Sequence, residues 1–173
     1  MYTPPVAPIS GPHLSLSRKL RFPTMYAPDT YPNLPDPMVQ PEFYDSVPIK
    51  RGLAWVIDAA LILALVVPIV VMTLFIALWF LPLLFFVVGF IYRVATLTGG
   101  SATWGMRLMS IEFRDSRGEH FDFSQAFMHT LGYTVSMSIF PLQLISIAMM
   151  FLTERGQGLT DMLLGTVAIN RRL

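Results

Sequence analysis

Residues 50–92 read KRGLAWVIDAALILALVVPIVVMTLFIALWFLPLLFFVVGFIY and decide the fold of this chain. Lys50 and Arg51 open the stretch, and Asp58 is the only charged residue that follows them. A helix of about 20 apolar residues crosses a bilayer, so this run is long enough for two passes. A soluble helical hairpin of this length would keep a polar face. We therefore predict a membrane protein in which Asp58 is a carboxylate in or near hydrocarbon.

The composition of the whole chain agrees with this prediction. The 173 residues are 54% hydrophobic and 13% charged, and the mean hydropathy is +0.57. A net charge of +1 gives no electrostatic reason to expect a nucleic-acid partner. The chain has no cysteine, and His13, His120 and His129 lack the spacing of metal ligands, so we expect no metal and no cofactor.

Residues 1–47 are predicted to be a disordered, proline-rich arm. Eleven of the 14 prolines lie between Met1 and Pro48, and proline at this density removes backbone donors and favours extended chain. The segment lacks the charged start and apolar run of a signal peptide. Insertion is thus expected to use the first membrane helix, and the membrane domain is expected to occupy residues 48–173.

Three hydrophobic helical segments are predicted in an all-α polytopic membrane protein. The first covers residues 49–75 with Pro68 inside it, and the second covers 82–96 after a turn at 77–82. The third covers 125–152, with Ser124 as its expected N-cap and with a kink or split at Pro141. A single kinked pass would leave the C-terminus outside the membrane, whereas a two-piece or re-entrant arrangement would return it to the cytoplasm.

The positive charges orient these segments. Lys50 and Arg51 lie at the start of the first helix and Arg93 lies near the end of the second, whereas the turn between the two helices is uncharged. The positive-inside rule places the charged ends, and with them the N-terminus, in the cytoplasm. Three arginines near the C-terminus favour a cytoplasmic tail as well: Arg155, Arg171 and Arg172.

A small cytoplasmic β-hairpin is predicted over residues 109–123. Apolar and polar residues alternate at 109–114 with the period of a half-buried strand, and alternate again around Asp122. Residues 115–118 read Asp-Ser-Arg-Gly, which is typical of a turn. Residues 167–169 are expected to form a short terminal strand beside the hairpin.

The charged side chains predicted to matter most are Arg51, Asp58 and Asp161. Arg51 and Asp58 are separated by two helical turns, or ~10 Å along the axis, which is too far for direct contact without a bridging group. Asp161 is the natural bridge if the tail folds back. A charged side chain at mid-membrane costs ~2.5–3.5 kcal/mol and normally has a partner in the bundle interior.

The sequence resembles the RDD family of bacterial membrane proteins, which is named for one arginine and two aspartates. Its opening signature is similar to Arg51-Gly-Leu-Ala-Trp-Val-Ile-Asp58, and its glycine-rich segment to residues 99–108. The strand and turn that follow are similar to residues 110–118, and the closing motif to 159–168, which carries Asp161. One departure is His129, because members of the family often carry arginine at that position.

The resemblance covers residues 48–170 and implies an inner-membrane protein with Arg51, Asp58 and Asp161 as a ligand or ion network. For the family, transport of an unidentified ligand, or ion exchange, is the implied role. Three segments are few for a complete pathway, so we expect a homo-oligomer or a larger membrane complex. The alternative is a non-catalytic accessory or assembly factor, in which the three charges lock helices together. The chain lacks HExxH, HxxxH and a Ser/His/Asp motif, so we expect no enzyme.

Overall fold

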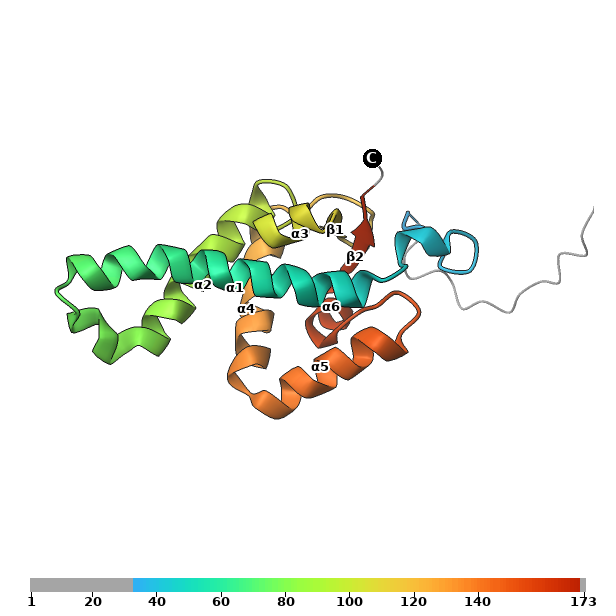
Figure 1. Cartoon of the computed structure of the whole chain (residues 1–173). Helices are drawn as coiled ribbons and strands as arrows, with labels where there is room; N and C mark the ends of the chain where they lie inside the picture. Colours follow the sequence, from blue (N-terminus) through green and yellow to red (C-terminus); the bar gives the residue numbers. More distant parts are fainter. Residues whose placement is uncertain (1–32, 172–173) are drawn as a thin grey trace, which may run out of the picture. The chain divides into compact units, whose positions relative to one another are not determined.

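The computed structural model describes residues 33–171, and residues 1–32 of the predicted arm lie outside the described residues. The described part is mostly helical and contains a two-stranded antiparallel sheet (Figure 1). It begins with a short 3-10 helix, η1 (Pro41–Phe43), which leads into the first long helix.

The two long helices form an antiparallel pair, which is clear in Figure 1. Helix α1 (Val47–Met72) continues through Pro68, and a 3-10 helix, η2 (Ile76–Phe80), connects it to α2 (Leu81–Thr98). Both helices are long and apolar enough to cross a membrane. Their contact is apolar and uses one face of α1, formed by Ile62, Val66 and Val70. The two predicted membrane helices are therefore present, and the first begins and ends two to three residues earlier than predicted.

The third hydrophobic segment is split. Helix α4 (Phe123–Ser138) and helix α5 (Phe140–Leu152) meet at a bend of 117°. Pro141 lies in the first turn of α5, where its missing N–H leaves no intrahelical bond unmade. With 16 and 13 residues, each helix is shorter than the ~20 residues of a full span. The described chain thus holds two candidate spans, or three if the bent pair counts as one.

The cap predicted for this segment was wrong. Asp122, and not Ser124, is the N-cap of α4, because the Asp122 carboxylate accepts a hydrogen bond from the Gln125 N–H at 2.7 Å. An aspartate suits this position because its charge also favours the positive end of the helix dipole.

The predicted β-hairpin was also wrong in its second strand. Strand β1 (Ile111–Arg114) pairs with β2 (Val167–Asn170), so that Ile111 faces Asn170 and Arg114 faces Val167. The expected terminal strand is present, and the turn at 115–118 forms. After the turn the chain leaves the sheet, because the Phe121 N–H donates to the Ser101 hydroxyl at 2.6 Å and α4 begins two residues later.

Part of the predicted disordered arm belongs to the folded unit. Leu34, Phe43 and Tyr44 are buried, and they form a cluster with Val167 and Ile169 of β2. The Tyr44 hydroxyl donates to the backbone carbonyl of Pro35 at 2.7 Å. The expected domain boundary at residue 47 therefore falls inside packed structure.

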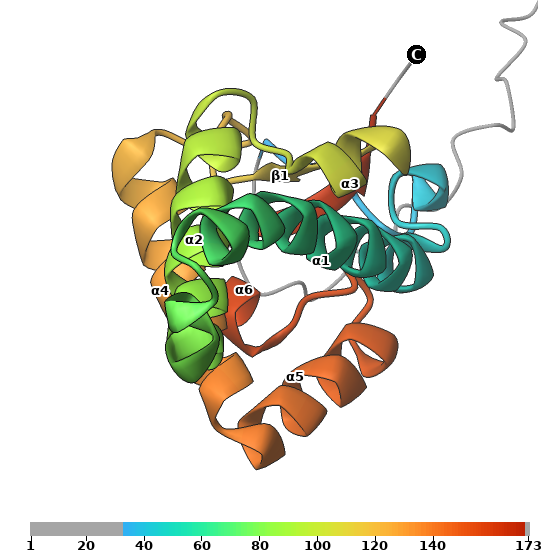
Figure 2. The same cartoon turned by 60° about the vertical axis from the view of Figure 1, so that its left-hand side comes forward.

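The main hydrophobic core surrounds the first half of α1. It joins the end of α2, the short helix α3 (Trp104–Leu108), both strands and the start of α4. The last helix, α6 (Leu159–Leu164), leads into β2. Figure 2 shows α3 and β1 on one side of α1 and α5 on the other. Lys50 and Arg51 of α1 consequently contact Asn170 of β2 and Asp161 of α6, at the far end of the sequence.

Candidate functional site

Asp58 is fully enclosed by hydrogen-bond donors. Its side chain is 1% exposed. One carboxylate oxygen accepts from the Tyr92 hydroxyl at 2.7 Å and from the Gly105 N–H at 2.8 Å. The other accepts from the Thr103 hydroxyl at 2.6 Å. Asp58 thereby fastens α2 and the start of α3 to α1.

Gly105 is glycine because the backbone of α3 lies against α1. A Cβ at this position would lie 2.2 Å from the Ala54 carbonyl oxygen and 2.8 Å from an Asp58 oxygen. No side chain fits there without moving one of the two helices. The glycine-rich segment seen in the sequence therefore serves this close approach and the hydrogen bond to Asp58.

Arg51 and Asp161 form the ion pair at the start of α1. The Arg51 Nη1 group lies 2.5 Å from one oxygen of Asp161 and also donates to the Gly156 carbonyl at 3.3 Å. The same Asp161 oxygen accepts from the Gly158 N–H at 2.9 Å, which holds the first turn of α6. This contact joins residues that are 110 positions apart in the chain.

His129 of α4 completes this charged cluster. Its Nε2 lies 2.8 Å from the second oxygen of Asp161, and the Thr166 hydroxyl donates to that oxygen at 3.4 Å. The ring of His129 also lies against Phe113, with centroids 4.4 Å apart. The sequence indicated His129 as a departure from the family pattern and as a histidine without metal-ligand spacing, but not as a partner of Asp161. The available signal was an ionisable side chain in an otherwise uncharged run.

The environment of Asp161 favours its charged form. Burial by itself would raise the pKa of this carboxyl, but the Arg51 guanidinium and the His129 hydrogen bond outweigh burial. The pKa of Asp161 therefore lies well below its usual range. Asp161 is an anion held by donors from α1 and α4 and from Gly158 and Thr166, which flank its own helix.

The three predicted residues do not form one directly bonded network. Asp161 contacts Arg51, but its hydrogen bonds do not extend to Asp58, so the expected bridge is not formed. Asp58 belongs instead to the cluster of Tyr92 and the 103–105 backbone. All three residues nevertheless line the same cavity.

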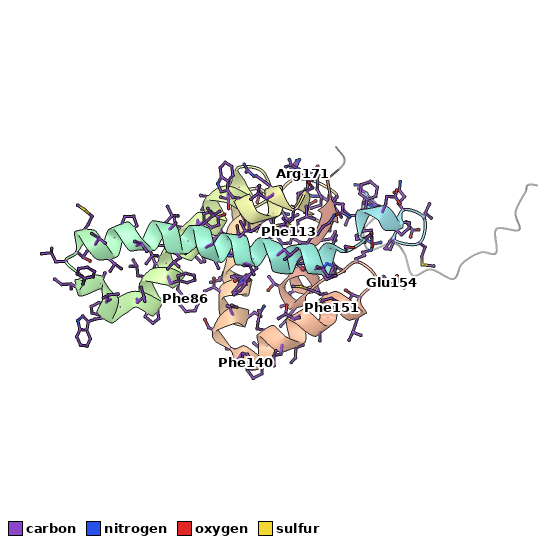
Figure 3. All side chains as sticks on the ribbon, in the orientation of Figure 1. Phe86, Phe113, Phe140, Phe151, Glu154 and Arg171 are labelled. Atoms are coloured by element: carbon purple, nitrogen blue, oxygen red, sulfur yellow. The ribbon has the colours of Figure 1, made fainter. Side chains whose placement is uncertain are left out.

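That cavity has a volume of about 590 Å³ and lies between α1, α4, α5 and α6. Its wall is mostly apolar, and it includes Phe113 of β1 and Phe151 of α5, both labelled in Figure 3. Phe140, at the bend between α4 and α5 in the same view, is 71% exposed and takes no part in the cavity. A mostly apolar pocket of this volume with a few polar groups is the usual form of a small-ligand site.

A second polar group lies in the cavity wall, away from the ion pair. The Arg93 guanidinium stacks over the Tyr133 ring, 4.1 Å from its centroid. The Tyr133 hydroxyl accepts from the Trp55 indole N–H at 2.8 Å. Arg93, Trp55 and Tyr133 thus tie α1, α2 and α4 together at the cavity. Within residues 33–171 there is no group of His, Asp and Glu side chains that could hold a metal ion.

The two long apolar helices are those of a helical membrane protein. A buried ion pair joins the two ends of its domain. The chain belongs to the RDD family, because the model of that family matches residues 46–165. RDD proteins are membrane proteins, in agreement with the two long apolar helices. The match includes Arg51, Asp58 and Asp161 and ends before β2. No curated protein and no solved structure matches the chain.

Proposed function

We propose that the protein is a multi-pass inner-membrane protein whose cavity binds an ion or small ligand during transport. The observation that carries this proposal is the cavity itself. Arg51 and Asp58 from α1, His129 from α4 and Asp161 from α6 all line one space of about 590 Å³. Ionisable groups at membrane depth are costly and commonly mark a pathway for a ligand or ion.

The orientation and the assembly belong to the same proposal. Lys50, Arg51 and Arg93 favour cytoplasmic ends for α1 and α2, with η2 on the outer side. Two or three spans are few for a complete pathway. Association with further copies or with a larger membrane complex would supply the missing walls. The proposed activity is binding and transport, without a chemical reaction.

A non-catalytic accessory or assembly factor is the second candidate, and one observation favours it. Asp58 already accepts three hydrogen bonds, and Asp161 has four donors around its two oxygens. Carboxylates with so many donors are well suited to holding helices together in a fixed arrangement. In this function the exposed apolar faces of α1, α2 and α5 would contact a partner protein in place of lipid.

Filling the cavity tests the first function against the second. Gly52 lines the cavity, and a Cβ added there meets nothing within 4 Å. Gly52→Phe should therefore fold normally and block the space. Leu63→Phe is the matched control, because Leu63 is 52% exposed on the same helix and lies outside the cavity.

The assay is flux in proteoliposomes, measured for cations with a Na⁺ gradient and an entrapped pH-sensitive dye, and for anions with radiolabelled phosphate and a radiolabelled alkyl phosphate. Transport through the cavity predicts flux in the wild type and in Leu63→Phe, and no flux in Gly52→Phe. Equal flux in the two variants would contradict a role for the cavity. An accessory factor should show no flux in any form and should instead be isolated from native membranes with a stoichiometric partner.

A further inference from the structure

We propose that the cavity takes an amphipathic anion, a phosphate or carboxylate carried on an alkyl chain. This inference rests on the proposed function, because it names the ligand class of the same cavity. It follows from which hydrogen-bonding groups of the cavity wall are already used and which are not.

Two arginines in the wall keep unused donors. Arg51 uses only its Nη1 group, for Asp161 and Gly156. Its Nε and Nη2 groups have no hydrogen-bond partner among the described residues. The Arg93 guanidinium stacks on Tyr133 and makes no hydrogen bond or ion pair within residues 33–171. A guanidinium has five N–H donors in a planar fork, which suits phosphate and carboxylate.

The carboxylates in the wall are, by contrast, already engaged. Asp58 is surrounded by Tyr92, Thr103 and Gly105, and Asp161 is paired with Arg51 and His129. A bare cation entering the cavity would have to displace these donors. The free capacity of the charged side chains is therefore donor capacity, which an anion can use without breaking an existing contact.

Neutral side chains of the wall add to the same excess of donors. In the described part of the chain, the Tyr133 hydroxyl accepts a hydrogen bond from Trp55 but donates none. The Gln143 amide accepts from the Ser136 hydroxyl, and its NH₂ group has no acceptor there. These groups can bind oxygen atoms of a ligand headgroup at several points around the cavity.

The remaining wall requires that the ligand also have an apolar part. Side chains without polar hydrogen-bonding groups make up most of the lining, among them Val56, Met137, Ile147 and Phe151. An inorganic anion would leave this surface in contact with water, whereas an alkyl chain would cover it. Trp55 and Tyr133 lie beside Arg93, and such aromatic side chains favour the headgroup level of a bilayer. The headgroup is thus expected at the arginines and the chain along the apolar wall.

The test uses fluorescence of Trp55, which lines the cavity. The full chain, with Trp79→Phe and Trp104→Phe, is purified in an uncharged detergent and titrated with a 2-bromoalkyl phosphate, whose bromine lies next to the headgroup and quenches nearby indole. The 2-bromo alcohol of the same length and inorganic phosphate are the comparison probes. The alkyl phosphate should quench at about tenfold lower concentration than the alcohol, as one charge-assisted hydrogen bond provides. Inorganic phosphate should compete only weakly.

Arg93→Gln should weaken binding of the alkyl phosphate about tenfold and leave the alcohol unchanged. Arg93→Lys, which keeps the charge, should retain part of the preference for the phosphate. Arg107→Gln is the matched control, because the Arg107 guanidinium also stacks on an aromatic ring, that of Trp104 at 5.1 Å, and lies outside the cavity. Because Arg107 lies outside the cavity, Arg107→Gln should leave both probes unaffected.

The outcomes separate this inference from the proposed function. Equal quenching by phosphate and alcohol, removed by Gly52→Phe, would overturn the anion class and leave the cavity as a ligand site. No quenching by either probe would overturn the amphipathic anion as the ligand and leave the proposed function to be decided by the flux assay. To identify the source of the ligand, the protein is reconstituted in phosphatidylcholine vesicles that contain brominated phosphatidylglycerol, and Trp55 fluorescence is measured. If the brominated lipid quenches Trp55 and Gly52→Phe removes this quenching, the ligand is a membrane lipid. If only the free alkyl phosphate quenches Trp55, the ligand is a soluble amphiphile.

Discussion

The ion pair between Arg51 and Asp161 provides the sharpest test of how this fold is held together. Arg51→Gln and Asp161→Asn each remove one charge and keep size and hydrogen-bonding capacity. The structure predicts that the two changes are strongly coupled, because the charged atoms lie 2.5 Å apart and the Asp161 side chain is 1% exposed. Asp58 is the comparison partner, since its hydrogen bonds go to other residues.

The magnitude follows from burial. Removing one member of a buried ion pair costs ~3–5 kcal/mol, because the other charge is left uncompensated. Arg51 is 13% exposed and lines a cavity, so it is only partly desolvated when Asp161 is changed. Asp161 keeps His129 and Gly158 as donors when Arg51 is changed. The cost of each change is therefore expected at the lower end of this range. We expect each single change to cost about 3 kcal/mol and the double change to recover about 2 kcal/mol of the summed loss.

The assay is a pair of double-mutant cycles on the free energy of unfolding in detergent. The cycle of Arg51→Gln with Asp161→Asn should show a coupling of about 2 kcal/mol. The cycle of Arg51→Gln with Asp58→Asn should be additive within about 0.5 kcal/mol, because the two side chains share no partner. Additivity in the first cycle, or strong coupling in the second, would refute the assignment of partners made here.

Three further predictions concern the clamp, the pH response and the topology. Gly105→Ala should lower the free energy of unfolding by about 3 kcal/mol, since its Cβ meets the α1 backbone. Gly52→Ala should instead raise the free energy of unfolding by about 0.5–1 kcal/mol, because Gly52 lies inside α1 and its Cβ would meet nothing. The pKa of Asp161 in the folded protein lies below the usual aspartate value of about 3.9, so the native state binds fewer protons than the unfolded state. The free energy of unfolding should therefore fall as the pH drops below that value. Asp161→Asn should make the free energy of unfolding less dependent on pH in this acidic range. In intact cells without an outer barrier, an impermeant thiol reagent should label a cysteine at Trp79 and not one at Arg117, and the reverse pattern would contradict the proposed orientation.

The sequence by itself determined the features that depend on neighbouring residues. An uncharged run from 59 to 92 requires two apolar helices, and Pro141 breaks the third segment, because length, charge and a missing N–H act locally. The order of the Arg51, Asp58 and Asp161 motifs was enough to identify the family.

Only the tertiary structure decided the pairings between distant segments. Alternation around residues 111–114 predicts a strand but cannot say whether its partner is the next segment or residues 167–170. Likewise, a seven-residue spacing places Arg51 and Asp58 on one helix face without saying which donors surround each carboxylate. Those partners, Tyr92 and Gly105 for Asp58 and His129 for Asp161, come from other helices. They are fixed by how α1, α2, α4 and α6 pack, because each contact depends on the positions of backbones that share no local sequence.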